Sequence, residues 1–310
     1  MNRVSVIMPA YKKRFLNDAI SSVLAQTYKD FEFIIVNDKS PEDLDSVVNS
    51  YEDSRIKYYV NEENIGGKDP VANWNKCLSY ATGEFVCLLC DDDRYEPEFI
   101  EKMLQMADRY PTVDLFHARV KVVDAYNNLI GNYNTVAEYL SAEDIVFHLV
   151  SGFMQMTVSE WFIRRNRMIE VGGYFAAPMA LFADNLSIVQ FGLKGGMVST
   201  SEQLVVFRHS GENISDQYNK NAYAWLEAID VYEKEMRRIV SNNNIEQKDV
   251  FNKMIAAQVI ADKSKIVYEL TFSQLLKAII HKNKFELPLW LCILGIYMYP
   301  VNKLRRMRKK

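Results

Sequence analysis

The sequence predicts an α/β protein whose central, mostly parallel sheet is flanked by helices and followed by a C-terminal helical appendage. Through the first half of the chain, β-rich runs alternate with helical segments of about ten residues. Polar clusters follow several of the β-rich runs, and from about Asp216 only helical spacing remains. Strands separated by helices pair in parallel because each crossover returns the chain to the same end of the sheet.

The elements of the predicted sheet can be placed in order along the chain. The β-rich runs span residues 4–8, 31–36, 56–60 and 84–90, and the last of these is the most apolar. Between them, apolar residues recur at helical spacing over residues 15–25, 43–51 and 71–81. Sheets of this kind bind ligands beyond the carboxyl ends of their strands. We therefore expect a site where polar residues follow two of the strands, at 37–38 and 91–93.

The C-terminal part of the chain has a different pattern. Apolar residues recur at helical spacing over 218–239 and again over 249–270. These patterns predict a sheet domain over residues 1–215 and a helical region over residues 216–310. Residues 289–299 are apolar apart from one glycine, and residues 303–310 hold six basic side chains and no acid. The apolar run is shorter than the roughly 20 residues that span a bilayer. It fits either an anchor on an anionic membrane surface or a buried helix with a solvated tail.

Charge and cysteine content exclude several classes of protein. A net charge of −3 argues against general nucleic-acid binding, which needs a basic surface. Cys87 and Cys90 have the spacing of a metal or redox pair, but they fall in the predicted strand at 84–90. Side chains three apart on a strand point to opposite faces, so we expect two buried, reduced thiols. Reduced cysteines and the lack of a secretory signal at the N-terminus predict a cytoplasmic protein.

Glycine placement excludes the two commonest nucleotide-binding loops. The first glycine is Gly66, and no Gly-x-Gly occurs anywhere in the chain. The Rossmann fingerprint and the Walker A loop both need glycines so that the backbone can approach phosphates. If this fold binds a nucleotide diphosphate, acids and a metal must neutralise it instead.

Three consecutive acids, Asp91, Asp92 and Asp93, follow the most apolar strand. Adjacent carboxylates repel one another unless water or a cation compensates them. Oxygen ligands suit Mn²⁺ or Mg²⁺, which can bridge a protein to a diphosphate. The cluster therefore predicts a divalent cation site.

The run from Val4 to Tyr11 ends in a Pro-x-Tyr turn, and a helical segment follows at residues 19–28. Val-Asn-Asp-Lys-Ser stands at 36–40, with further landmarks at residues 64–66 and 81–84. In this order, over residues 2–215, the sequence resembles a family 2 glycosyltransferase of the GT-A fold, with its first strand and Pro-x-Tyr turn, its following helix and its Val-Asp-Asp-Gly-Ser run. The resemblance implies that the donor nucleotide is bound by the residues Pro9, Ala10, Tyr11, Asn37, Asp38, Asn64, Gly66, Asp91 and Asp92.

The resemblance extends to the chemistry. Leu-Cys-Asp-Asp-Asp at 89–93 resembles the family's Leu-Asp-x-Asp-Asp, which implies that Asp92 and Asp91 bind the metal. Asp184 falls at the position of the family's catalytic base. His209 lies in an element similar to the family's Arg-x-His and is implied as a further metal ligand. Taken alone, Asp184 fits a helix cap or a surface acid better than a catalytic base, and His209 fits a structural imidazole as well as a contact to diphosphate or metal.

The function that follows is an inverting transfer of a sugar, by a hexosyltransferase, from a nucleotide sugar to an acceptor hydroxyl. We expect a UDP-linked donor, and a glycan or lipid-linked acceptor of bacterial-type surface polysaccharide or glycolipid assembly. We also expect the protein to lie peripherally on the inner face of the plasma membrane. Two alternatives stay open: a non-catalytic scaffold of the same fold that binds nucleotide or glycan, and a sugar-phosphate nucleotidylyltransferase.

Overall fold

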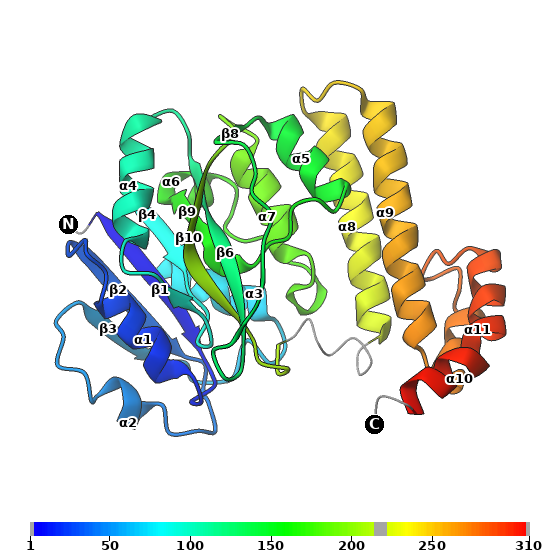
Figure 1. The fold of residues 1–310 in the computed structure, drawn as a ribbon, viewed down its shortest axis with the longest axis horizontal. Helices are drawn as coiled ribbons and strands as arrows, with labels where there is room; N and C mark the ends of the chain where they lie inside the picture. The colour runs from blue at the N-terminus through cyan, green and yellow to red at the C-terminus, as the bar shows by residue number, and fades with distance from the viewer. Residues whose placement is uncertain (1–2, 214–221, 308–310) are drawn as a thin grey trace. The chain divides into compact units, whose positions relative to one another are not determined.

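A computed structural model describes residues 3–213 and 222–307, and it divides the chain into two compact units (Figure 1). The first unit comprises Met1–Ala176 and Ala183–Gly211, and the second comprises Ala177–Phe182 and Glu212–Lys310. The boundary predicted between residues 215 and 216 lies outside the described residues, as does the start of the helical pattern at Tyr218. That boundary stays a prediction.

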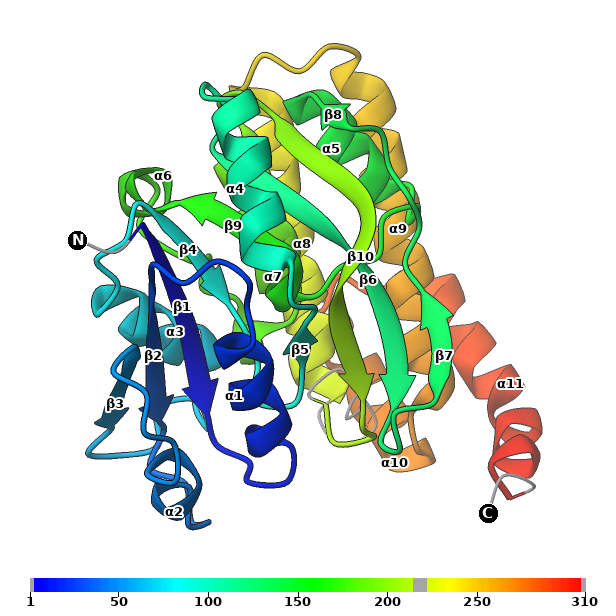
Figure 2. The same ribbon diagram turned by 60° about the vertical axis from the view of Figure 1, so that its left-hand side comes forward.

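The first unit is built on one mixed sheet. Its strands run in the order β3-β2-β1-β4-β9-β6-β10-β5, with β7 paired to β6 and β8 to β10. Figure 2 shows β3, β2, β1 and β4 side by side. The strands are β1 (Val4–Ala10), β2 (Phe31–Asn37), β3 (Ile56–Val60), β4 (Phe85–Leu88), β5 (Arg94–Tyr95), β6 (Leu115–Asp124), β7 (Leu129–Asn132), β8 (Tyr139–Leu140), β9 (Trp161–Arg164) and β10 (Met197–His209).

The first four strands form the predicted parallel arrangement. β1 pairs in parallel with β2 on one side and β4 on the other, and β3 continues the parallel order beyond β2. β9 is antiparallel to both β4 and β6, while β6 and β10 are parallel to each other. β9 is therefore a single antiparallel strand between two parallel sets that run in the same direction.

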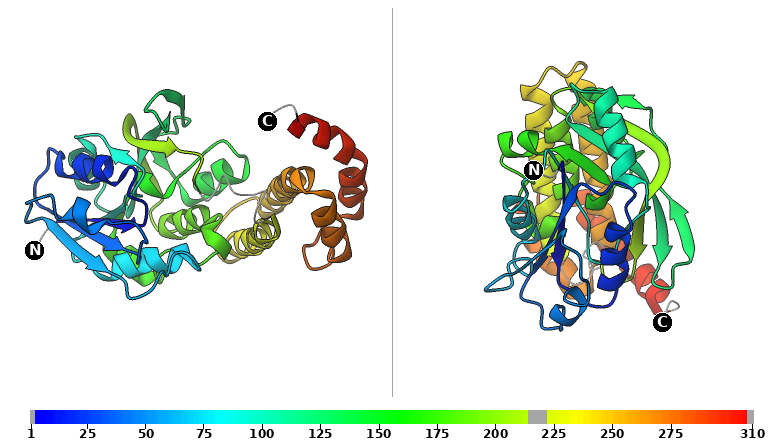
Figure 3. Two further views of the ribbon diagram at one scale, coloured as in Figure 1. Left: turned by 90° about the horizontal axis from the view of Figure 1, so that it is seen from below. Right: turned by 90° about the vertical axis from the view of Figure 1, so that its left-hand side faces the viewer.

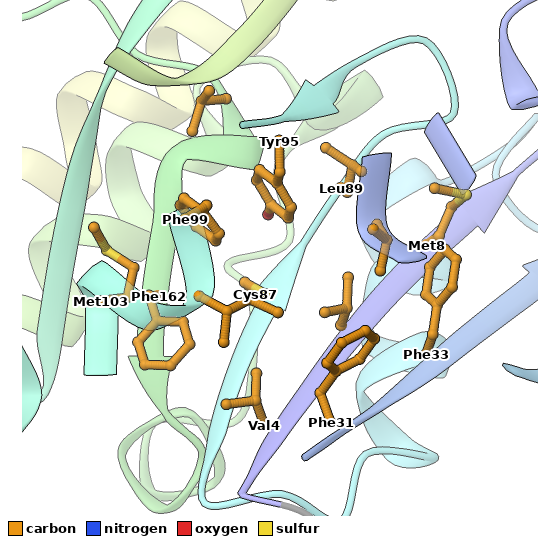
Figure 4. Close-up of a cluster of buried hydrophobic side chains, with 14 of the residues drawn as sticks. Val4, Met8, Phe31, Phe33, Cys87, Leu89, Tyr95, Phe99, Met103 and Phe162 are labelled. Atoms are coloured by element: carbon orange, nitrogen blue, oxygen red, sulfur yellow. The ribbon is translucent and has the colours of Figure 1, made fainter. Parts of the chain in front are cut away.

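Helices cover both faces of this sheet. The first unit contains α1 (Leu16–Leu24), α2 (Asp45–Val48), α3 (Pro70–Ser79), α4 (Phe99–Arg109), α5 (Ala142–Val150), α6 (Arg165–Glu170), α7 (Ala183–Gly192) and the 3₁₀ turn η1 (Val158–Glu160). Val4 and Met8 of β1 join Phe31 and Phe33 of β2 in a buried core that also includes side chains of α1 and α4 (Figure 4). Alternate residues of β1 point the other way. On that face α3 packs against β1 and β2.

The predicted elements were close to those observed, with two differences. The helix predicted at 43–51 is a single turn, Asp45–Val48. The strand predicted at 84–90 ends at Leu88, so the prediction that Cys90 lies on a strand face opposite Cys87 is wrong. The reason is a long-range contact: the backbone N–H of Cys90 donates to Ser159 Oγ at 3.3 Å instead of to a neighbouring strand. Cys87 is buried, Cys90 is half-buried, and the cysteines of the described chain are free thiols, as predicted.

The second unit is helical. It contains η2 (Pro178–Ala180), α8 (Ala222–Asn242), α9 (Lys248–Glu269), α10 (Phe272–Ile280) and α11 (Leu289–Met307). α8 and α9 pack side by side, and α11 packs against both α9 and α10 (Figure 3). The helical region expected from the sequence is thus present. Among the described residues, no helix combines the length and the apolar character needed to cross a bilayer.

Candidate functional site

The carboxyl ends of β1, β2 and β4 meet at one edge of the sheet, and the predicted site residues follow them. Asp91 follows β4, and its Oδ2 accepts hydrogen bonds from the backbone N–H groups of Tyr11 and Lys12, each at 2.7 Å. Those two residues come directly after β1. Asp91 therefore ties the loop after β1 to the acidic turn after β4. Burial, together with the charge of Asp92, raises the pKa of the Asp91 carboxyl to about 6, against the effect of the two N–H donors.

Asp93 is fixed by residues from distant parts of the chain. Its Oδ2 accepts from Ser159 Oγ at 2.7 Å, and its Oδ1 accepts from the backbone N–H of Arg208 at 3.0 Å. Arg208 is buried, and its Nε donates to the backbone carbonyl of Asp92 at 2.9 Å. Its guanidinium carbon lies 4.1 Å from the centre of the Phe15 ring. Burial and the charge of Asp92 raise the pKa of Asp93 well above its usual range.

The acidic turn is suited to a divalent cation. Ligand atoms of Cys90, Asp92 and Asp93 lie within 4.8 Å of one another. Lys12 Nζ is 3.9 Å from Asp92 Oδ2, and the charges of Asp92 and Asp93 also act on the buried Arg208 guanidinium, so Lys12 and Arg208 together face three buried carboxyl groups. The raised pKa values of Asp91 and Asp93 reflect this excess of buried acid. An ion of charge +2 would relieve it, and the oxygen donors are those that Mn²⁺ and Mg²⁺ prefer.

The predicted metal ligands are only partly brought together. Asp91 and Asp92 are adjacent in the acidic turn, and Asp93 and Cys90 lie with Asp92 in the compact group. Burial raises the pKa of the Cys90 thiol well above its usual value, and a neutral thiol is a poor ligand for a hard cation. His209 ends β10 opposite Asp124 of β6, with an exposed side chain, and it is not part of the compact group. Its role as a ligand stays a prediction.

Asp38 organises the loop that carries two other predicted residues. Its Oδ1 accepts from Asn61 Nδ2 at 2.7 Å and from the backbone N–H of Ile65 at 2.9 Å, and its Oδ2 accepts from Gly66 N–H at 2.6 Å. A Cβ on residue 66 would come within 2.8 Å of Asp38 Oδ2, so glycine permits this approach. Since a carboxylate offers about four acceptor positions, these three bonds leave room for one more donor.

The remaining predicted donor-binding residues surround Asp38. Pro9 and Ala10 end β1, and the carbonyl of Tyr11 accepts from Ser40 Oγ at 2.6 Å. The side chain of Asn37 donates to Tyr58 Oη at 2.9 Å and accepts from the backbone N–H of Ser40. Asn64 accepts from the N–H of Gly67. The loops after β1, β2 and β3 are therefore joined at the same sheet edge as the acidic turn.

Asp184 lies in the first turn of α7 and is half-buried. Its Oδ1 accepts from the backbone N–H of Asn185 at 2.8 Å. Burial raises the pKa of this carboxyl to about 6, a value near that of an efficient general base at neutral pH. The residues just before it in the chain include Met179, Ala180 and Phe182, all with positive φ. Non-glycine residues adopt this conformation at a cost, which is characteristic of functional segments.

Sequence reasoning missed two residues that stabilise or adjoin these acids. Ser159 holds Asp93, and the next residue, Glu160, is completely buried with Oε1 3.8 Å from His117 Nε2. The pKa of Glu160 lies well above its usual range because of its burial, and the charges of Asp184 and Asp93 act in the same direction. An acid set between Val158 and Trp161 in an otherwise apolar stretch was the signal available for Glu160. Nothing in the sequence ties Ser159 to Asp93.

Comparison with known proteins decides the family. The profile of Glycosyl transferase family 2 matches residues 5–169, more than half of the chain. The chain belongs to glycosyl transferase family 2. This confirms the predicted family and class of enzyme, and it favours a glycosyltransferase over the nucleotidylyltransferase that the sequence left open.

Individual relatives agree with this assignment. A GalNAc(5)-diNAcBac-PP-undecaprenol β-1,3-glucosyltransferase of Campylobacter jejuni is 38% identical over 111 residues, which cover 35% of this chain and 35% of that protein. The match to the first four curated relatives spans between 30% and 53% of their lengths.

Solved structures confirm the GT-A fold. S. aureus TarS 1–349 in complex with UDP-GlcNAc has a TM-score of 0.67 at 15% identity, covering 99% of this chain and 92% of that one. A mannosyltransferase from Pyrobaculum calidifontis in complex with GDP-Man and Mn²⁺ has a TM-score of 0.55 at 13% identity, covering 96% and 87%.

Proposed function

We propose that this family 2 glycosyltransferase inverts the anomeric centre of a UDP-linked sugar as it transfers the sugar to a hydroxyl of a lipid-linked glycan. The observation that carries the proposal is the acidic turn at the carboxyl edge of the sheet, where buried carboxyl groups outnumber the cations facing them. The complex of TarS with UDP-GlcNAc supports a uridine donor. The C. jejuni relative, named for a diphosphoundecaprenol substrate, supports a lipid-linked acceptor.

The donor would be bound between the loops that Asp38 and Asp91 organise. Asp38 keeps an acceptor position beside the loop at residues 61–66, which suits a hydroxyl or an N–H of the nucleoside. Asp91 fixes the backbone of Tyr11 and Lys12, and the ammonium of Lys12 lies beside Asp92. These contacts preorganise the edge on which a diphosphate would lie.

Asp92, with Asp91 or Asp93, would hold a Mn²⁺ or Mg²⁺ ion. Bound there, the ion would supply Lewis-acid stabilisation of the charge that develops on the diphosphate, an effect worth several kcal/mol. Arg208 fixes the acidic turn through two hydrogen bonds. Its Nε donates to the backbone carbonyl of Asp92, and its backbone N–H donates to the carboxylate of Asp93. The side chains thus meet an ion with little rearrangement of the loop.

Asp184 is the proposed general base. With a pKa of about 6 its carboxylate form predominates at neutral pH, and its basicity is higher than that of an exposed aspartate. Oδ1 is held by the N–H of Asn185, which leaves Oδ2 to accept the proton of the acceptor hydroxyl. Loss of that proton makes the oxygen a nucleophile, and attack from the face opposite the leaving diphosphate inverts the anomeric centre.

Donor binding tests the proposal directly. Thermal unfolding would be followed with UDP, GDP or dTDP, each with Mn²⁺ and with EDTA, on the wild type, Asp92→Ala and the exposed-loop control Asp30→Ala. We expect a large shift in Tm with UDP and Mn²⁺ that EDTA and Asp92→Ala abolish and that Asp30→Ala retains. A shift in Tm with GDP or dTDP instead would show that the donor carries that nucleotide and not UDP. No shift with any nucleotide would overturn the proposal in favour of a scaffold that binds glycan alone.

A further inference from the structure

The last two helices of the second unit expose an apolar face. On α10 the exposed apolar side chains are Phe272, Leu276 and Ile280, spaced four residues apart. On α11 they are Leu289, Trp290, Ile293, Ile296 and Tyr297. At 3.6 residues per turn, each set occupies about a third of its helix circumference. We call these eight residues the α10–α11 face.

The opposite sides of both helices are packed in the unit. Leu275 and Ala278 of α10 are buried, as are Leu291 and Cys292 of α11. At Gly295 the backbone of α11 approaches its neighbours so closely that a Cβ would lie 2.7 Å from Val267 Cγ1 of α9. Each helix therefore has one apolar side in the protein core and a second apolar side in solvent.

The two helices contact each other through an aromatic pair that includes Phe272 of the α10–α11 face. The rings of Phe272 on α10 and Tyr299 on α11 have their centroids 5.5 Å apart. Eight large apolar side chains over two adjoining helices make a surface that monomeric soluble proteins rarely leave exposed. Such a surface indicates a binding partner.

The composition of this C-terminal segment indicates which partner. Residues 270–310 contain nine lysines and arginines against one acid, Glu286, although the whole chain has a net charge of −3. Lys277 lies on the exposed part of α10, and Lys282 and Lys284 follow that helix. The face also carries Trp290 and Tyr297, aromatic types that favour the boundary between lipid and water. A surface that combines apolar residues, aromatic residues and cations suits an anionic lipid surface. It suits a protein partner with few acids or no net charge less well.

We propose that α10 and α11 together dock the protein on an anionic phospholipid bilayer, lying in the interface with the α10–α11 face among the acyl chains. The sequence pointed only to the run at 289–299 and the basic tail; the structure adds α10 as half of the binding surface. This docking rests on its own observations, and it deepens the proposed function by bringing the enzyme to the surface that holds lipid-linked acceptors.

Vesicle flotation tests this docking. The full chain would be floated with phosphatidylcholine vesicles that contain or lack 30% phosphatidylglycerol, without nucleotide or acceptor. Trp290→Ser/Ile293→Ser removes side chains that are 51% and 59% exposed. The matched control, Leu129→Ser/Ile130→Ser on β7, removes side chains that are 61% and 53% exposed. A third variant, Leu276→Ser on α10, tests the part of the surface that the structure adds.

We expect the wild type and the control to float with anionic vesicles. The α11 double variant should lose at least about tenfold in partition, and Leu276→Ser about threefold, because each loses apolar area from the lipid. Added salt should weaken wild-type binding. Equal flotation of all proteins, or none for the wild type, would overturn the proposal.

Two further measurements keep these outcomes distinct. Thermal unfolding shows whether a variant is folded, and a variant that unfolds early would be replaced by Tyr297→Ser. Light scattering without lipid tests a second copy of the chain as the partner. If the α11 double variant converts a dimer to a monomer, the face is a dimer interface and the membrane proposal fails. Because the flotation experiment contains no nucleotide sugar, a negative result would count against membrane docking and not against the proposed nucleotide binding.

Discussion

One buried acid and a group of three lie at opposite ends of the same parallel strands, and they differ in how their charge is compensated. At the amino end, Glu32 of β2 accepts from Ser5 Oγ at 2.6 Å and from the N–H and hydroxyl of Thr82, and it pairs with Lys57. These partners lower its pKa to about 2 in spite of burial. At the carboxyl end, burial and mutual repulsion raise the pKa of Asp91 to about 6 and hold that of Asp93 well above its usual range.

The contrast separates an acid that stabilises the fold from acids that need a ligand. Glu32 joins β1, β2, β3 and the start of β4 through neutral donors and one ammonium group. The acidic turn has three carboxyl groups, which are compensated by backbone donors, the Ser159 hydroxyl and the charges of Lys12 and Arg208. A carboxylate that is fully compensated contributes to stability, whereas a concentration of incompletely compensated ones is a site for a cation. The predictions below test this distinction.

The largest expected effect is on catalysis by Asp184. Asp184→Asn should lower the turnover of a saturating donor and acceptor by about 10²–10⁴-fold, because the amide cannot take the proton of the acceptor hydroxyl. Donor binding should be unchanged, since among the described residues the Asp184 carboxylate is hydrogen-bonded to Asn185 and not to the loops around Asp38 and Asp91. Steady-state kinetics together with the UDP-dependent shift in Tm would check both. Full activity of the variant would remove Asp184 from the mechanism.

The next effect concerns the acidic turn itself. Asp92→Asn should reduce transfer by about 10²–10³-fold through the loss of a metal ligand, and excess Mn²⁺ should restore part of the rate if weakened affinity is the cause. The unfolding temperature without metal should stay constant or rise, because the substitution removes repulsion with Asp91 and Asp93. A clear drop in Tm would show that Asp92 is part of the stabilising framework, as Glu32 is, and would weaken the distinction.

The first four strands and their shared edge could be predicted because their signals are local. Apolar runs separated by helical spacing specify a parallel set, and a parallel set brings residues after β1 and β4 to one edge. The hydrogen bonds from Tyr11 and Lys12 to Asp91 follow from that arrangement. The family resemblance supplied the proposed roles of Asp92 and Asp184, which periodicity alone could not give.

The remainder of the site depends on long-range pairing that leaves no local pattern. Ser159 and Arg208 reach Asp93 from positions 66 and 115 residues away. Their placement needs the antiparallel β9 and the long β10, and β9 is only four residues long. Likewise, the end of β4 at Leu88 depends on a hydroxyl from η1. The exposed face of α10 was also missed, because amphipathic spacing shows which residues are apolar but not which of two apolar sides is covered.

A stability effect of about 1–3 kcal/mol is expected from the amino end of the sheet. Glu32→Gln keeps an oxygen for Ser5 and Thr82 but loses the charge that faces Lys57. Chemical denaturation should show this loss, while transfer per folded molecule stays at the wild-type value. The exposed acid Glu62 gives a matched control, for which Glu62→Gln should change stability by less than about 0.5 kcal/mol. A fall in specific activity with Glu32→Gln would mean that the two ends of the strands are coupled.

The smallest effect is a difference in pH dependence between the two ends. The lowered pKa of Glu32 means that its ionisation contributes stability above its unfolded pKa of about 4.3, and that the contribution is lost as pH falls toward 2. The gap in unfolding free energy between wild type and Glu32→Gln should therefore be constant from pH 7 to 5 and shrink below about pH 4.

Transfer should already fall about tenfold between pH 7 and 5, because Asp184, with a pKa near 6, becomes protonated. Since Asp91 titrates in the same range, donor binding with Mn²⁺ must be followed at each pH. Binding that weakens in step with the rate would assign the loss to the acidic turn, whereas constant binding with a falling rate would assign it to the base.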